Sequence, residues 1–221
     1  MSDIIAGICA GFSQTIIGHP LDTVKVLMQN GKTWRNLTVR TSYRGLGYPL
    51  ISSVLVNSST FTIYERTIKF TESAILSGAI AGFLTSPILF FFDIGKIKEQ
   101  TNQRMSMQKI FTTPGFTTTV GRETMSLAIY FKTYDIFKNE YNVHPFLAGG
   151  ISGLATWTFT YPLDIIRSRQ MAQNITALQA LSFGQLWKGF TPCALRAILV
   201  NGACFSTYDT VFSMLEKHNL E

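Results

Sequence analysis

Long apolar stretches with few charged side chains alternate with short polar segments along this chain. Two of these stretches, residues 73–92 and 145–163, carry no charged side chain. Each is close to the roughly 20 mostly apolar residues that a helix needs to cross a bilayer. Hydropathy alone does not exclude a soluble helical protein, because the other apolar stretches carry charges. The pattern predicts six long helices, at residues 2–29, 48–69, 73–100, 117–138, 145–171 and 190–217.

One motif occurs three times at a fixed spacing. Each copy has two glycines four residues apart, an aspartate eleven residues after the second glycine, and a base three residues later. Successive copies are 71 residues apart, which indicates an internal structural repeat. We therefore predict a single domain, residues 1–221, made of two-helix repeats at residues 1–70, 71–142 and 143–221. The aspartates are Asp22, Asp93 and Asp164, and the bases are Lys25, Lys96 and Arg167.

The glycine pairs lie on one face of each first helix. Small residues four positions apart let two helix backbones approach closely in a membrane. We expect close helix packing there, either static or sliding during a functional cycle. The pairs are Gly7 and Gly11, Gly78 and Gly82, and Gly149 and Gly153.

The charged residues of the motif share a helix face with a glutamine, because positions i, i+3 and i+7 align on a helix. The glutamines are Gln29 and Gln100, and Met171 takes this place in the third repeat. Isolated charges inside a membrane are costly, so each is expected to find a partner. Pairing within each helix is one solution. A ring across the repeats is the other and the one that we predict, with the pairs Asp22–Lys96, Asp93–Arg167 and Asp164–Lys25.

Composition favours a membrane protein. Charged residues make up 14% of the chain, below the roughly 25% of soluble proteins. The net charge is +6, but the bases form no nucleic-acid-binding motif, so no nucleic-acid partner is expected. Three connections, residues 30–46, 101–121 and 172–189, contain bases and no acid. Basic connections on one side are typical of a multi-pass membrane protein.

The sequence shows no recognisable catalytic or metal-binding group. Cys9, Cys193 and Cys204 lack metal-ligand or redox spacing, and the three histidines form no cluster. No nucleophile stands with a base and an acid at a catalytic spacing. We therefore expect no enzyme activity, no cofactor and no metal site.

Residues 20–25 and 162–167 read PLDTVK and PLDIIR, and both resemble the signature of the mitochondrial carrier family. Residues 43–45 and 187–189 resemble the aromatic-basic-glycine element that follows it, and residues 134–138 resemble the family's second gate motif. The resemblance covers the whole chain. It implies an all-α protein of the mitochondrial inner membrane, with six transmembrane helices around a three-fold pseudosymmetric cavity that opens alternately to cytoplasm and matrix. The implied partners are a small-molecule solute and membrane lipid, including cardiolipin, and the implied state is a monomer.

By the same resemblance, the ring of aspartates and bases is the matrix gate, braced by Gln29 and Gln100. A cytoplasmic gate is implied where the second helices end in aromatic–acid pairs. Ile68 and Phe212 replace two of its three bases, so we expect this gate to be weak. Its residues are Tyr64, Glu65, Tyr134, Asp135, Lys138, Tyr208 and Asp209.

The chain departs from the family pattern in two ways. It is short, and the loss falls in the basic connections. In the second repeat Phe91 replaces the signature proline, and Pro87 lies one helical turn earlier, so a differently placed kink is expected. In the same repeat, Pro114 and Gly115 stand where an aromatic-basic-glycine element is expected.

The resemblance places the substrate midway along the second helices. Arg122 and Glu123 are adjacent charges inside a predicted membrane helix, which is a functional hypothesis by default. Arginine can clamp a carboxylate and glutamate can bind an ammonium, so the pair favours exchange of an amino acid or related zwitterion. One alternative is a nucleotide carrier that uses Arg122, Lys132 and Arg196 for phosphates, and another is a non-transporting membrane scaffold. The expected substrate-site residues are Asn57, Thr60, Phe61, Arg122, Glu123 and Arg196.

Overall fold

The computed structural model describes residues 2–35, 37–102, 113–196, 199–200, 207, 210–211 and 214, and every regular element within them is helical. The helix that begins at residue 190 starts where it was predicted, but its predicted continuation to 217 lies mostly outside the described residues. Two short helices occupy connections. The helices are α1 (Ser2–Gln29), α2 (Val39–Ser42), α3 (Gly47–Thr71), α4 (Ala74–Gln100), α6 (Phe116–Asp135), α7 (Pro145–Gln173) and α8 (Ala177–Ser182).

The predicted bounds of the long helices are confirmed to within a few residues. The largest difference is at the end of α6, which was predicted to continue to residue 138. There the α-helix ends at Asp135 and passes into one turn of π-helix, η1 (Ile136–Glu140). Proline lies inside α1, α4 and α7, at Pro20, Pro87 and Pro162.

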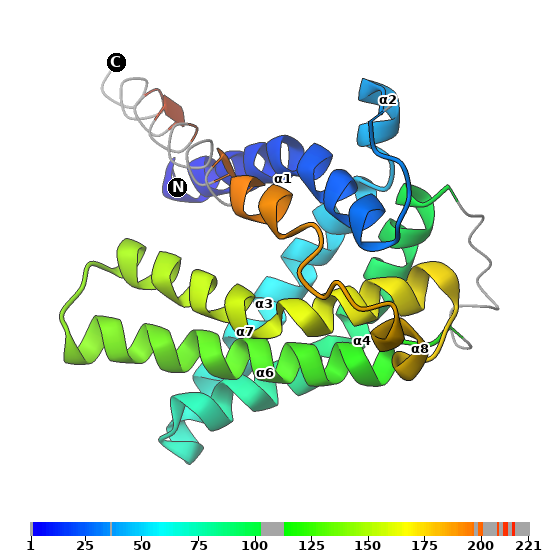
Figure 1. Cartoon of the computed structure of the whole chain (residues 1–221). Coiled ribbons are helices and arrows are strands. Elements are labelled where there is room, and N and C mark those ends of the chain that lie inside the picture. Colours follow the sequence, from blue (N-terminus) through cyan, green and yellow to red (C-terminus); the bar gives the residue numbers. More distant parts are fainter. Residues whose placement is uncertain are drawn as a thin grey trace.

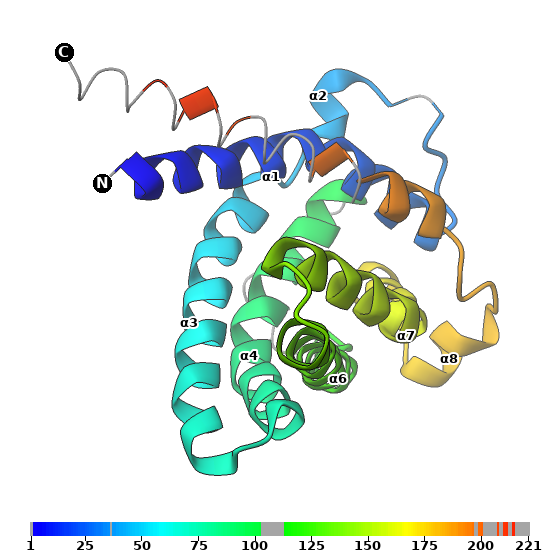
Figure 2. The same ribbon diagram turned by 90° about the vertical axis from the view of Figure 1, so that its left-hand side faces the viewer.

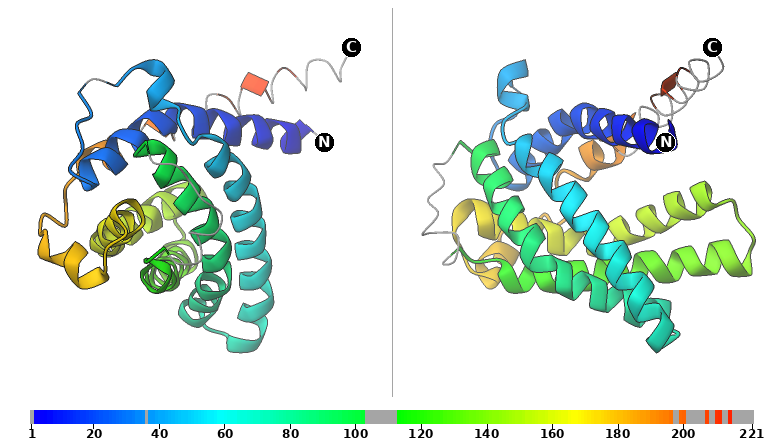
Figure 3. Two further views of the ribbon diagram at one scale, coloured as in Figure 1. Left: turned by 90° about the vertical axis from the view of Figure 1, so that its right-hand side faces the viewer. Right: turned by 180° about the vertical axis from the view of Figure 1, so that it is seen from behind.

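The long helices from α3 to α7 pack side by side in the order in which they occur in the chain. α3 packs beside α4, α4 beside α6, and α6 beside α7, and α1 crosses one end of this row (Figure 2). The turns after α3 and η1 lie at the end of the molecule where α1 begins, and α2 and α8 lie at the opposite end (Figures 1 and 3). The two acid-free connections that contain α2 and α8 therefore share one end. Arg104 and Lys109, the bases of the third acid-free connection, lie outside the described residues.

Polar side chains are buried between the helices, while large apolar side chains cover much of the outside. Asp164 and Arg167 are 4% and 8% exposed, whereas Phe83 on α4 and Leu154 on α7 are 58% and 62% exposed. Of the described helices, α4 alone is long and apolar enough, by length and composition, to cross a membrane. Buried charge and exposed apolar surface fit helices that face lipid outside and enclose a polar path.

The ends of several helices follow from local side-chain chemistry. Glu72 ends α3 in the left-handed region, at φ 50°. Ser73 then caps α4, because its hydroxyl accepts a hydrogen bond from the Leu76 amide. Thr38 and Thr176 begin α2 and α8 with capping boxes. The two-residue connection keeps α3 and α4 antiparallel and adjacent.

The second glycine pair makes the close helix contact that its spacing predicts. A Cβ atom added at Gly78 or Gly82 would collide with the backbone of α6, at the carbonyls of Leu127 and Glu123. The third pair differs, because no described atom lies within 4 Å of a Cβ at Gly153. The surroundings of the first pair, Gly7 and Gly11, lie outside what the structure describes. Close packing is thus confirmed for α4 against α6.

Three glycines at positive φ precede the second helices and repeat one contact around the molecule. They are Gly45, Gly115 and Gly189, with φ of 77°, 117° and 86°. A Cβ at these glycines would lie 3.2 Å from the carbonyl oxygen of Lys96, 3.8 Å from that of Arg167 and 3.3 Å from that of Lys25, respectively. Each glycine therefore lies against a motif base of another repeat. Gly115 keeps this contact although its repeat lacks the aromatic-basic pair.

We expect Gly45→Ala to lower the thermal unfolding temperature of the purified protein in detergent. The left-handed conformation costs a residue with a Cβ about 1–2 kcal/mol, and the new methyl group would also crowd the Lys96 carbonyl. Gly47→Ala is the matched control, because Gly47 is the first residue of α3 and has open space around it. Equal unfolding temperatures for the two variants would contradict this account.

Candidate functional site

The aspartates and bases of the three motifs form one ring of ion pairs between repeats. The side chains come from α1, α4 and α7, one motif to each helix, and all lie at the same level of the molecule. This pairing across repeats is the one predicted from the sequence, and the distances confirm it. The Nζ of Lys96 lies 2.8 Å from Asp22, the Nη1 of Arg167 lies 2.6 Å from Asp93, and the Nζ of Lys25 lies 2.7 Å from Asp164.

The alternative pairing within a helix occurs once, in addition to the ring. The Nη2 of Arg167 also donates a hydrogen bond to Asp164, three residues earlier on α7, at 3.2 Å. Arg167 thereby joins two carboxylates of different repeats. A guanidinium can do this because its fork of donors reaches two acceptors at once. The lysines at the other two positions each reach one aspartate.

The two glutamines behave differently. Gln29 donates to Asp164 at 3.2 Å, next to the Lys25 pair, as expected for a brace. Gln100 instead donates to the hydroxyl of Thr23 at 3.0 Å, so its expected bond to a ring ion pair is not observed. Thr23 in turn donates to the carbonyl of Ser42 at 2.7 Å. Gln100 therefore links α4 to α1 beside the ring rather than bracing a charge.

The arginines expected in a separate substrate site contact the ring. The Nε of Arg196 lies 2.7 Å from Asp22, and the Nε of Arg122 lies 3.8 Å from Asp164. Arg122 also forms an ion pair with Glu123. Substrate-site and ring residues thus form one cluster of four carboxylates and five bases, with one excess positive charge. Its carboxylates are Asp22, Asp93, Glu123 and Asp164, and its bases are Lys25, Lys96, Arg122, Arg167 and Arg196.

The ring is closed. The cavity that its side chains line has a volume of about 60 Å³, which has room for a few water molecules but not for an amino acid. The side chains of Asp164 and Arg167 are 5% and 9% exposed. A solute that passes this level must therefore separate the ion pairs.

The other substrate candidates lie on α3 and do not join this cluster. Asn57 and Phe61 are exposed and Thr60 is buried. The ring of Phe61 contacts the edge of Phe131 on α6, with centroids 6.3 Å apart. Among the described residues, no ion pair or ring contact connects these three residues with Arg122, Glu123 or Arg196. Their role as the opposite wall of the substrate site therefore stays a prediction.

The expected cytoplasmic gate carries no ion pair between helices within the described residues. Asp135 instead pairs with Lys132 at 3.8 Å on its own helix and accepts a hydrogen bond from Asn139 at 2.7 Å. Lys138 lies over the ring of Tyr134 and forms no ion pair with Glu65 or Asp135 among the described residues. Tyr208 and Asp209 lie outside the described residues.

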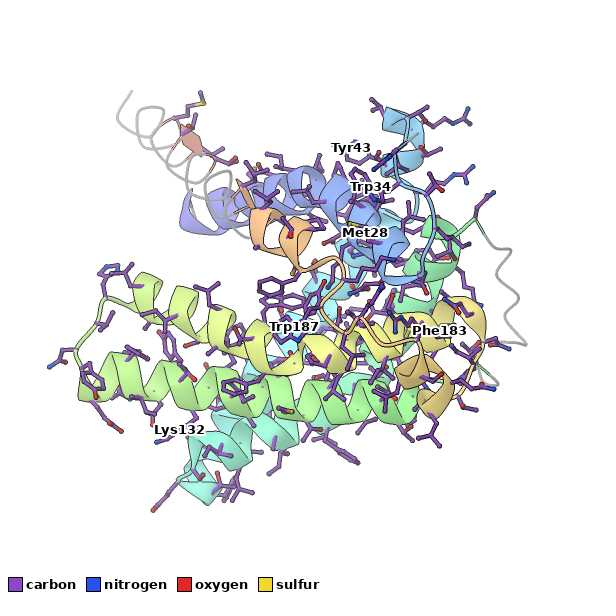
Figure 4. The ribbon with its side chains drawn as sticks, viewed as in Figure 1. Met28, Trp34, Tyr43, Lys132, Phe183 and Trp187 are labelled. Atoms are coloured by element: carbon purple, nitrogen blue, oxygen red, sulfur yellow. The ribbon has the colours of Figure 1, made fainter. Side chains whose placement is uncertain are left out.

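Aromatic side chains take the place of ion pairs at this end. Tyr64 of α3 stacks on Phe131 of α6, with ring centroids 3.6 Å apart, and Tyr130 stacks on Tyr134 at 6.3 Å. Lys132 lies toward this end of the molecule, whereas Met28 and Phe183 lie toward the other (Figure 4). Lys132 also lies about 15 Å along α6 from Arg122, so it is separated from an arginine with which a nucleotide site would combine it.

Sequence reasoning missed Arg169 on α7, whose hydrogen bonds connect the first and third repeats near the ring. Its Nε donates to the carbonyl of Gln29 at 3.0 Å, and its Nη1 donates to the carbonyls of Ala180 and Gly184 at 2.9 and 2.8 Å. Arg169 is 4% exposed. It lies two residues after Arg167, and a second base at this spacing from the motif was the signal available.

Trp157 on α7 was also missed. The Nζ of Lys25 lies 4.3 Å from the centroid of its indole, and the Cζ of Arg122 lies 5.5 Å from it. The same indole packs against Tyr161 in a small cluster with Cys193. Trp157 therefore touches both the ring and the adjacent arginine. No group of three His, Cys, Asp or Glu among the described residues could hold a metal ion.

Comparison with known proteins gives consistent matches. A family model described as mitochondrial carrier protein matches residues 1–33 and 138–219, just over half of the chain. The chain is 28% identical to the mitochondrial basic amino acids transporter of Bos taurus over 272 aligned residues, which cover 96% of this chain and 91% of the relative. It is 26% identical to the mitochondrial arginine transporter BAC2 of Arabidopsis thaliana over 274 residues, covering 96% and 91%.

A further relative, solute carrier family 25 member 45 of Mus musculus, is 26% identical over 279 residues, which cover 95% of this chain and 97% of the relative. These alignments are longer than the chain itself, so the relatives carry residues that it lacks. Most of the second repeat lies outside the family match. That repeat is the one without the signature proline and the aromatic-basic pair.

Proposed function

Because this chain belongs to the mitochondrial carrier family, we propose that it carries basic amino acids across the mitochondrial inner membrane by alternating access. It is a multi-pass membrane protein of that membrane and a transporter of small solutes rather than an enzyme. The observation that carries the proposal is the buried cluster in which Arg122, Glu123 and Arg196 contact the ring of ion pairs. A solute bound by these residues would compete directly with the contacts that close the ring.

The proposed architecture has six membrane helices in three repeats around a central path. The 71-residue period and the repeated glycine contacts at Gly45, Gly115 and Gly189 support it. The ring is proposed as the matrix gate, with α2 and α8 on the matrix side, because the connections that contain them carry bases without acids. A monomer in a membrane that contains cardiolipin is part of the same proposal.

The chemistry of the cluster favours an amino acid as the solute. Arg122 and Arg196 can bind its carboxylate in bidentate fashion, and Glu123 can accept hydrogen bonds from its ammonium group. The excess positive charge of the cluster would be neutralised by one carboxylate. A nucleotide would meet the carboxylate of Glu123 and would not reach Lys132. The relatives named for transport of basic amino acids and of arginine support the same class.

The described state corresponds to a carrier that is closed toward the matrix. Ion pairs close the ring, while Glu65, Asp135 and Lys138 at the other end form no ion pair between helices with any residue that the structure describes. Two states of a protein are populated according to the contacts that stabilise each. The weak cytoplasmic gate therefore favours the state that is open to the cytoplasm.

A thermal-shift measurement tests the proposed solute class. We expect arginine and lysine to raise the unfolding temperature of the purified carrier in detergent, because a ligand at 100 times its Kd stabilises the folded state by about 2.7 kcal/mol. Leucine and ADP, the matched neutral and phosphorylated compounds, should give little or no shift. A shift with ADP and none with the basic amino acids would refute the proposal.

A further inference from the structure

The indole of Trp157 contacts both Lys25 of the ring and the adjacent Arg122. Lys25 comes from α1, Arg122 from α6 and Trp157 from α7, so three helices contribute to the two cation–π contacts of this indole. Both cations already have carboxylate partners, Asp164 for Lys25 and Glu123 for Arg122. The indole lies within cation–π range of both of them, at 4.3 and 5.5 Å.

The place of Trp157 along α7 puts it in the path of a solute. It lies seven residues before Asp164, on the same helix face and about 10 Å closer to the start of α7. In the proposed orientation α7 starts at the cytoplasmic end. A solute that enters from the cytoplasm therefore meets Trp157 before it meets the ring.

The repeats differ at this position. Subtracting the repeat period places Ser86 and Thr15 at the positions that correspond to Trp157. An aromatic side chain is thus present in one repeat out of three. A solute without three-fold symmetry can be oriented only by positions at which the repeats differ, and this position is one of them.

We propose that Trp157 determines specificity for the cationic end of the solute, an inference that rests on the proposed function. The carboxylate and α-ammonium of a basic amino acid would be held by Arg122, Arg196 and Glu123, and its second cation would lie against the indole. This cation competes with Lys25 for the aromatic face and repels it. Binding of a basic solute thereby weakens the Lys25–Asp164 pair and promotes opening of the ring.

The experiment compares two solutes that differ in charge and little in shape. Arginine ends in a guanidinium, and citrulline ends in an uncharged urea group. Initial uptake rates of both are measured with the purified full-length protein in liposomes. We expect wild type to favour arginine, and Trp157→Leu to reduce the arginine-to-citrulline ratio roughly tenfold. Trp157→Phe, which keeps an aromatic face of smaller quadrupole, should give an intermediate ratio.

Trp187→Leu is the matched control. Trp187 stacks on Tyr161 in the same aromatic cluster, with ring centroids 5.7 Å apart, and no described cation lies over its ring. Its loss should leave the solute ratio unchanged, even if it lowers the amount of folded protein. If Trp157→Leu does not fold, Trp157→Phe alone decides the matter.

The outcomes separate the two proposals. Uptake of arginine by wild type with an unchanged ratio in both Trp157 variants overturns the role of Trp157 and leaves the proposed function intact. Absence of arginine uptake by wild type overturns the proposed function, and this inference with it. An equal fall in both uptake rates, with the ratio preserved, assigns Trp157 to packing and also overturns the inference.

Discussion

The Arg167→Gln variant should lose amino-acid exchange roughly 100-fold, because breaking a buried ion pair leaves a charge without compensation at a cost of about 3–5 kcal/mol. Arg167 is the ring base that binds two carboxylates, Asp93 at 2.6 Å and Asp164 at 3.2 Å. Asp164 keeps Lys25, but Asp93 has no other ion pair among the described residues. The state closed toward the matrix is therefore destabilised. The measurement is the initial exchange rate in liposomes.

The double variant Arg167→Gln with Asp93→Asn tests whether the uncompensated charge causes this loss. It removes the charge that the single variant leaves buried, so exchange should recover relative to Arg167→Gln alone. Arg40→Gln is the control, because Arg40 is an exposed base on α2 that does not belong to the cluster. Exchange by Arg167→Gln at the wild-type rate would show that the ring is not a gate.

The Glu123→Gln variant should abolish uptake of basic amino acids and leave any nucleotide uptake unaffected or improved. Glu123 is the carboxylate of the cluster that stands apart from the three motifs, and it pairs with Arg122. Without it the solute ammonium loses its acceptor. Arg122 is also released toward Asp164, whose Oδ1 already lies 3.8 Å away. We expect a loss of roughly 100-fold, since truncating one partner of a buried charge pair costs 2–5 kcal/mol.

Initial rates for labelled arginine and labelled ADP, in wild type and variant, decide this prediction. Glu140→Gln is the control, because Glu140 is exposed on η1. Unimpaired arginine uptake in Glu123→Gln would remove Glu123 from the substrate site. An increase of ADP uptake in the variant would support Glu123 as a residue that rejects phosphates.

The ring could be predicted because its geometry follows from spacing alone. Asp22 and Lys25 lie three residues apart on one helix, and the period of 71 residues places their counterparts at the same level. Charge balance then left only pairing within or between helices. The structure shows pairing between helices for all three bases, and Arg167 also pairs within its own helix.

The contacts of Arg122 and Arg196 with the ring could not be predicted from spacing. They depend on helix tilt and on how far a long side chain reaches between helices. Neither property produces a periodic pattern in the sequence. The indole of Trp157 is a similar case. Its importance lies in which cations surround it, and these come from α1 and α6.

Sequence comparison between the repeats was partly misleading at the glycine elements. Residues 113–115 lack the aromatic-basic pair of the other two repeats, yet Gly115 has positive φ and lies against Arg167. What the repeats share there is a glycine whose backbone has a positive φ. At the other end, no ion pair between helices joins the described gate residues, and the stacking of Tyr64 on Phe131 needed the relative positions of α3 and α6.

The measurement that tests the central claim most directly is solute exchange by the purified wild-type protein in liposomes. Vesicles loaded with arginine are given labelled arginine outside, with lysine and ADP as competitors. The account predicts saturable uptake of labelled arginine that lysine inhibits and ADP does not. Uptake of labelled ADP with no uptake of any basic amino acid would contradict it.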